Sequence, residues 1–162
     1  MLNLQTQQNP KVKRIIQWRE YLETLPDERF FEIIRIYLGE IHTPFNKQNL
    51  IERLSSIFRK EQNKNVILSF LSDLDIKVIS LILYIENLEQ ASLIDFFKSE
   101  YSLSDIYSEL LNLNERLIIW TYKNPETNKV ELKINPLLED VFIPYCKVQS
   151  LLPIPTYSER TY

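Results

Sequence analysis

The sequence predicts a mainly α-helical protein with one β-hairpin near its C-terminal end. Apolar residues recur at helical spacing in most segments before residue 116, which is typical of amphipathic helices. Residues 129–134 instead alternate polar and apolar side chains, which is the period of a half-exposed strand. The chain has 162 residues and is 44% hydrophobic, which suits one compact domain or two small helical units that share a core.

The first helix is expected over residues 10–24. Pro10 suits its first position, because the N–H group that proline lacks is not needed there. One stripe of this helix interleaves basic and aromatic side chains, namely Lys11, Arg14, Trp18 and Tyr21. Such a stripe suits the stacking of nucleic acid bases or contact with a partner protein. The alternative for Trp18 is packing between helices in the core.

Two further helices complete the N-terminal segment. The second begins at residues 26–28, where two carboxylates favour the positive end of a helix dipole, and Gly39 is a candidate left-handed cap at its end. The third is expected over residues 46–60. Its inward-facing side chains recur at helical spacing: Leu50, Ile51, Leu54, Ile57 and Phe58.

The next segment contains four expected helices. Three of them cover residues 65–71, 75–87 and 90–98. The fourth is capped by Ser102 or Ser104, because serine side chains accept hydrogen bonds from the first turn of a helix. Its apolar side chains are expected to form one buried face: Ile106, Tyr107, Leu110, Leu111 and Leu113.

Two strands follow, over residues 117–122 and 130–134, joined by a polar turn at 124–128. A last helical turn is expected at 137–141. The chain then divides into three predicted parts: N-terminal helices at 1–62, a helix-and-hairpin unit at 63–146, and an extended proline-containing tail at 147–162.

The composition argues against several classes of functional site. Gly39 is the only glycine, so phosphate-binding loops that need several glycines are excluded. His42 is the only histidine, which leaves few options for a metal site or a histidine-based triad. We therefore expect no enzyme activity, no cofactor, no metal site and no small-molecule substrate.

The lone cysteine, Cys146, excludes an internal disulfide and is compatible with a reducing cytoplasm. The longest apolar run, at 76–85, is shorter than the roughly 20 residues that a membrane span needs. Residues 1–10 are polar and lack the apolar core of a signal peptide. A cytoplasmic protein that does not enter a membrane is expected.

Charge is distributed unevenly along the chain. Residues 1–24 carry four positive and two negative side chains, whereas residues 63–116 carry four positive and nine negative ones. The remaining two segments are balanced. Basic side chains therefore gather at the front of the chain and acidic side chains in the middle.

Three helices followed by two strands, over residues 75–134, resemble winged-helix domains. The resemblance implies that the third helix faces the partner, which in DNA-binding members is the major groove. Here the solvent-facing positions of that helix include two carboxylates and precede the first basic residue, Arg116. Because carboxylates repel phosphate, we expect this face either to be solvated or to contact a protein rather than DNA: Asp105, Ser108, Glu109 and Asn112.

Residues 30–58 resemble a SAP motif, a helix–extended–helix unit that often binds the DNA backbone. The second helix reads K-Q-N-L-I-E-R-L from Lys47, so that Lys47 and Arg53 fall at the basic positions of the motif. Phe45 stands where the family commonly has glycine. The resemblance implies backbone contacts, and this departure weakens that implication more than the implied fold.

Two functions follow from these patterns. The first is a nucleic-acid-associated protein that contacts phosphates through Lys11, Arg14, Lys47, Arg53, Arg59 and Lys60, with Trp18 as the candidate for stacking on a base. The hairpin adds three lysines, which either touch phosphate or only protect an exposed strand edge: Lys123, Lys129 and Lys133. The second function is a protein–protein adaptor that uses the acidic helix face.

Overall fold

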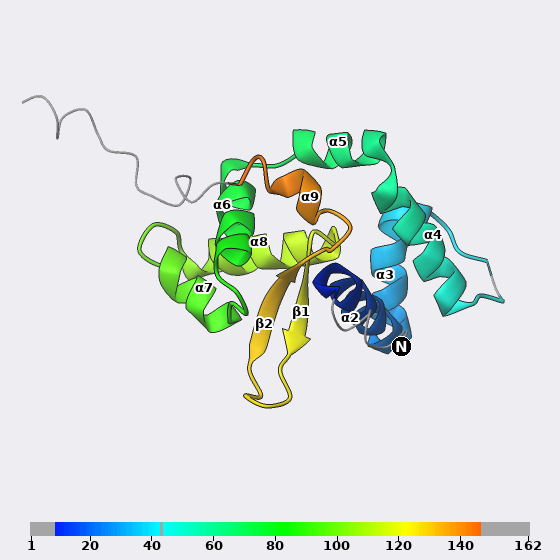
Figure 1. Ribbon diagram of the computed structural model, residues 1–162, viewed down its shortest axis with the longest axis horizontal. Helices are drawn as coiled ribbons and strands as arrows, with labels where there is room; N and C mark the ends of the chain where they lie inside the picture. The colour runs from blue at the N-terminus through cyan, green and yellow to red at the C-terminus, as the bar shows by residue number, and fades with distance from the viewer. Residues whose placement is uncertain (1–8, 43, 147–162) are drawn as a thin grey trace, which may run out of the picture.

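The computed structural model describes residues 9–42 and 44–146 and confirms a mainly helical fold with one hairpin (Figure 1). Helices α2 to α4 lie on one side of the hairpin in Figure 1, α6 and α7 lie on the other, and α8 runs across the end of the hairpin between them. The predicted tail at 147–162 lies outside the described residues. Within the described ranges, no helix is both long enough and apolar enough to cross a membrane.

The N-terminal helices are α2 (Pro10–Thr24), α3 (Asp27–Leu38) and α4 (Lys47–Arg59), close to the predicted ranges. The side chain of Asn9 caps α2, and that of Asn46 caps α4 by accepting a hydrogen bond from the backbone of Asn49. Gly39 follows α3 with a φ of 71°, a conformation that favours glycine.

Helix α5 (Glu61–Ser69) begins four residues before the predicted start, because its first turn is polar and gives no apolar period. Helix α6 (Asp73–Tyr84) begins with a capping box. The Ser72 hydroxyl accepts a hydrogen bond from the backbone N–H of Asp75, and the Asp75 carboxylate accepts one from the backbone N–H of Ser72.

Helices α7 (Gln90–Phe97) and α8 (Leu103–Glu115) follow, and Ser102 rather than Ser104 caps α8. Strands β1 (Ile119–Lys123) and β2 (Val130–Ile134) form an antiparallel pair, in which Ile119 lies opposite Ile134. The segment before α7 extends this sheet through a bridge between Glu89 and Glu131. A short helix, α9 (Glu139–Phe142), comes after the hairpin.

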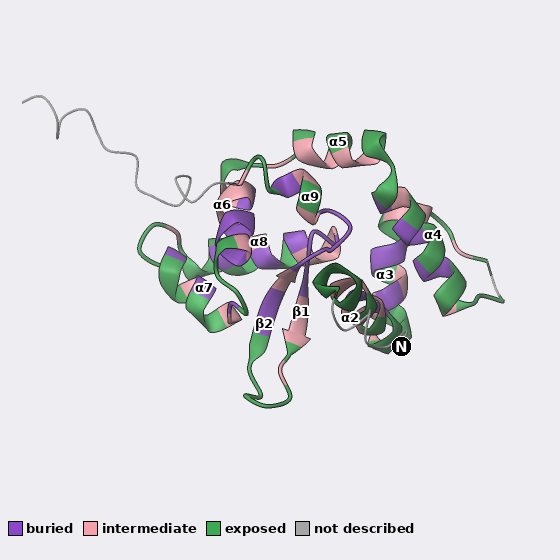
Figure 2. Ribbon diagram, in the orientation of Figure 1, coloured by how far each residue is buried: buried purple, intermediate pink, exposed green. Residues whose placement is uncertain are grey.

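One cluster of buried side chains joins the two predicted halves of the chain (Figure 2). Trp18 and Phe30 from the first half belong to it, as do Trp120 and Phe142 from the second. The division predicted at residue 62 falls inside α5. Helix α2 packs on both α4 and β1, so the N-terminal helices and the hairpin share their core. This packing decides which side chains remain free for a partner.

Candidate functional site

The two basic residues predicted on the first helix bind the last helix of the described chain. Both Nε and Nη2 of Arg14 donate hydrogen bonds to the Glu139 carboxylate, at 2.9 and 2.8 Å. Lys11 Nζ lies 2.6 Å from Asp140, and its hydrogen bond lowers the pKa of that carboxyl below the ordinary range. These cations therefore hold α2 against α9 within the molecule.

Trp18 lies in the core and not on the surface. Its exposed fraction is 0%, and its ring meets the ring of Phe58 edge to face at 6.2 Å. The indole therefore has no face free for a nucleic acid base, and its assignment to a binding surface was wrong. Its spacing from Lys11 and Arg14 placed it on their stripe, but its bulk takes it into the space between α2 and α4.

Lys47, which falls at a basic position of the SAP-like pattern, also makes its contacts within the molecule. Its ammonium donates hydrogen bonds to the backbone carbonyls of Glu23 and Leu25, at 3.0 and 2.6 Å. It lies 4.8 Å from the centre of the Phe30 ring and 3.4 Å from the Asp27 carboxylate. Lys47 thus binds the carbonyls left unpaired at the C-terminal end of α2.

The remaining basic residues of the predicted nucleic acid surface lie on or next to α4. Arg59 lies 3.6 Å from Glu52, which Arg19 contacts at 2.9 Å. The hydrogen bond from Arg19 lowers the pKa of Glu52 below its ordinary value. Arg53 and Lys60 are exposed, and neither side chain has an ion pair with another described residue. The structure therefore leaves only a small part of the predicted basic set free.

Two of the three hairpin lysines also have carboxylate partners. Lys129 lies 3.5 Å from Glu89, and Lys133 lies 3.2 Å from Glu131. Lys123 is exposed and has no ion pair in the described part of the chain. Glu131 is buried and Val130 is exposed, so β2 does not keep the predicted alternation of exposed charged and buried apolar side chains. Lys129 and Lys133 are bound within the molecule.

The four polar residues predicted on the acidic helix face line one surface hollow. Asp105, Ser108, Glu109 and Asn112 project from α8 and border a space of about 600 Å³. The opposite wall comes from the start of α6 and the loop before α8: Ser72, Leu74, Asp75 and Tyr101. Of the predicted site sets, this is the one whose members all meet in one place.

Two carboxyl groups lie together at this hollow. Asp75 is 4% exposed, and Glu109 Oε1 is buried without a hydrogen-bond donor. Burial, followed by the hydrogen bond to Asp75, raises the pKa of Glu109 from 4.5 to about 8. For Asp75, burial alone would raise the pKa, but hydrogen bonds from Glu109 and Ser72 and the charge of Arg116 lower it overall. The pKa is therefore raised on Glu109 and lowered on Asp75, as expected for two neighbouring carboxyl groups that share a proton.

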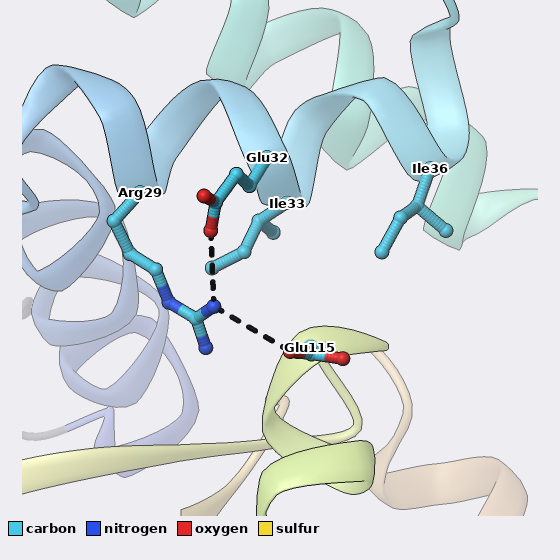
Figure 3. Close-up of a pocket in the computed structure, with 5 residues that line it drawn as sticks. All are labelled: Arg29, Glu32, Ile33, Ile36 and Glu115. Carbon is cyan, nitrogen blue, oxygen red and sulfur yellow. Dashed lines mark hydrogen bonds and ion pairs between the residues drawn. The ribbon is translucent and has the colours of Figure 1, made fainter.

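The end of α8 is fixed by the N-terminal helices. Arg29 of α3 lies between Glu32 and Glu115, at 3.4 and 3.7 Å (Figure 3). The hydroxyl of Tyr37 donates a hydrogen bond to the backbone carbonyl of Arg116, and burial raises the pKa of this tyrosine to about 12. These contacts hold the C-terminal end of α8 against α3.

Arg116 completes the anchoring of the carboxyl pair. Its Nη1 lies 3.5 Å from Asp75 Oδ2 and donates a hydrogen bond to Asn112 at 3.1 Å. This guanidinium therefore balances the charge of Asp75 and leaves the other carboxyl groups of the hollow without a paired cation. Among the described residues, no group of three metal-binding side chains is placed to hold a metal ion.

An exposed apolar stripe runs along the same helix. Leu103, Tyr107 and Leu111 are 53%, 52% and 54% exposed and recur every four residues. Beside it lies a second hollow of about 240 Å³, whose lining includes Leu110 and Leu132. Tyr107 and Leu111 were predicted to be buried, and this was wrong. The core covers only the narrower sector of α8 around Leu110, and periodicity alone does not say how wide that sector is.

The comparisons with known proteins concern the other end of the chain. A family model named TP_0021_N, described as an N-terminal domain, matches residues 4–59, which is less than half of the chain. The comparisons with curated proteins and with solved structures gave no match. The matched segment contains α2, α3 and α4, so the face of α8 is interpreted from its own geometry.

Proposed function

We propose that this protein is a non-enzymatic adaptor that binds another protein through the outer face of α8. That face consists of the apolar stripe (Leu103, Tyr107 and Leu111) and the acidic hollow (Asp105, Ser108, Glu109, Asn112 and the side chains opposite them). The observation that carries the proposal is their position on one exposed helix. Large apolar side chains gathered on a surface mark interaction sites, and tyrosine is enriched in them.

The arrangement of α6, α7, α8 and the hairpin supports a winged-helix unit as the framework of this adaptor. Helix α8 stands where the partner-facing helix of such a unit would be, and its first basic residue is Arg116, just past its end. The exposed carboxyl group of Asp105 on its outer side disfavours a phosphate backbone. The lone cysteine, Cys146, is half-buried and fits a protein of the reducing cytoplasm.

Photo-crosslinking tests the adaptor function. A photoreactive phenylalanine derivative placed at Ser108 or at Asn112 is expected to capture the same protein in cells that make this chain, because both positions border the hollow. The matched control is the same substitution at Gln48, which is exposed on α4, on the side of the hairpin away from α6 and α7 (Figure 1). Capture of the same proteins from Gln48, or of none from α8, would contradict the proposal.

Nucleic acid binding is the second candidate, supported by the free side chains of Arg53 and Lys60. It is weaker because Arg14 and Lys47 are bound within the molecule. Anisotropy of labelled duplex and single-stranded DNA is expected to show no saturable binding near physiological salt. A steep fall in affinity with rising salt, lost in the double variant Arg53→Gln, Lys60→Gln, would instead establish phosphate contacts.

A further inference from the structure

The two parts of the α8 face differ in chemistry, and they lie along opposite edges of the exposed side of the helix. Because successive residues are about 100° apart around the helix, one edge carries Leu103, Tyr107 and Leu111, and the other edge carries Asp105 and Asn112. Ser108 falls between the two. A partner segment laid over Ser108 would therefore touch apolar side chains on one side and carboxyl groups on the other.

The acidic hollow lacks a cation of its own. Three carboxyl groups line it, those of Asp75, Asp105 and Glu109, and its lining includes no lysine or arginine. Two cations outside the lining contact residues that belong to it. Arg116 contacts Asp75 and Asn112. At the rim, Lys77 lies 3.4 Å from Glu100 and 3.2 Å from the hydroxyl of Tyr101.

We propose that the segment bound by α8 is a cationic amphipathic helix, whose apolar face covers Leu103, Tyr107 and Leu111 and whose lysine or arginine side chain enters the hollow beside Asp105 and Glu109. The inference rests on the proposed function and adds the chemistry of the partner. Its basis is charge complementarity: the Asp105 carboxyl has no paired cation among the described residues, and Glu109 beside it can ionise when a cation approaches, so a long cationic side chain is the group that this open space would attract.

The dimensions also fit one helix. The 13 residues of α8 make it about 20 Å long. A partner helix of about 18 residues is about 27 Å long and roughly 10 Å across. It therefore covers α8 from end to end and contacts both edges of its exposed side. Packing on Tyr107 and Leu111 also fills the small hollow above Leu110 and Leu132.

Binding of this cation has a consequence for the proton on Glu109. Its carboxyl faces Asp75 and Ser72 of the α6 start, Asp105 and Asn112 of α8, Tyr101 of the preceding loop, and Arg116. A lysine ammonium beside it favours the ionised form, so that Glu109 releases its proton as the partner binds. Affinity for a cationic segment is then higher at about pH 8.5 than at about pH 6.

Synthetic peptides test the proposal on the full-length protein. Three peptides of about 18 residues share one leucine face and carry lysine, glutamine or glutamate on the other face. We expect the lysine peptide to bind about tenfold more tightly than the glutamine peptide, and the glutamate peptide to bind least. Calorimetry in buffers of different ionisation enthalpy is expected to detect a proton released with the lysine peptide only.

Matched variants separate the charge from the apolar contact. Asp105→Asn is expected to lower the affinity for the lysine peptide several-fold and to leave the affinity for the glutamine peptide unchanged. Glu126→Gln, which removes one charge from the exposed hairpin turn, is the control and is expected to change the affinity for either peptide little. Glu109→Gln is expected to abolish the proton release. Circular dichroism and thermal unfolding confirm that each variant is folded.

The outcomes distinguish a failure of the cationic partner from a failure of the adaptor function. Equal affinity for the lysine and glutamine peptides, with Leu111→Ser weakening both, would overturn the cationic partner and leave the adaptor face standing. Equal effects of Asp105→Asn and Glu126→Gln would also overturn it, because the attraction would then be non-specific. Binding of none of the peptides, together with an absence of crosslinks from Ser108, would overturn the adaptor function as well.

Discussion

Replacement of Trp18 by alanine is expected to lower the free energy of unfolding by about 3–5 kcal/mol, the range for removal of a large buried aromatic side chain. Trp18 has an exposed fraction of 0%, and its ring contacts Phe58, which in turn meets Tyr37 at 4.9 Å. The alanine variant therefore leaves a cavity between α2 and α4. Urea denaturation followed by circular dichroism measures the loss.

Trp18→Phe is the matched control. The indole Nε1 is buried without a hydrogen-bond partner, so phenylalanine keeps most of the apolar contact and loses no hydrogen bond. A cost of about 1–2 kcal/mol is expected from the smaller ring. If Trp18→Ala left the free energy of unfolding unchanged and reduced binding to single-stranded DNA, the core role of Trp18 would be wrong. Trp18 would then stack on a nucleic acid base instead.

Glu109→Gln is expected to change how stability depends on pH. Burial and the contact with Asp75 raise the pKa of Glu109 from 4.5 to about 8, so the folded protein holds a proton that the unfolded chain releases. The resulting stabilisation is complete below about pH 4.5 and is lost as pH rises through about 8. Glutamine carries no charge and still donates a hydrogen bond to Asp75.

The variant and the wild-type protein should therefore be similarly stable near pH 5, and the variant should be more stable at about pH 8.5 by about 1–2 kcal/mol after allowance for solvent screening. Asp75 does not alter this comparison, because its lowered pKa acts at more acidic pH. Thermal and urea unfolding across this range measure the difference. Glu126→Gln on the exposed turn serves as the control, and parallel pH profiles for all three proteins would contradict the raised pKa.

Local patterns sufficed to predict most of the fold. Pro10 begins α2 and Gly39 follows the end of α3 as predicted, and residues 130–134 form β2, although Val130 is exposed and Glu131 is buried, against the predicted alternation. These features depend on residues close together in the sequence, so a window of a few turns contains the necessary information. The start of α5 was missed for the same reason, because its first turn has no apolar residue to reveal the period.

The candidate site was only partly predictable. The polar positions of α8 followed from helical spacing, and the structure brings all four to one hollow. The roles of Arg14 and Lys47 did not follow, because their partners lie far along the chain: Glu139 is 125 residues from Arg14, and Leu25 is 22 residues from Lys47. An exposed stripe and a buried stripe of one helix have the same period, so Tyr107 and Leu111 were placed wrongly.

The contact between α2 and α9 has a consequence for how the protein is made. A ribosome releases α2 first and α9 last among the described helices, and domains form as their parts emerge. Arg14 and Lys11 must therefore wait for Glu139 and Asp140, and Tyr21 must wait for Trp120, before one side of the first helix is covered. Until residues 139 and 140 are available, Lys11 and Arg14 lack the carboxylates that they contact in the folded protein.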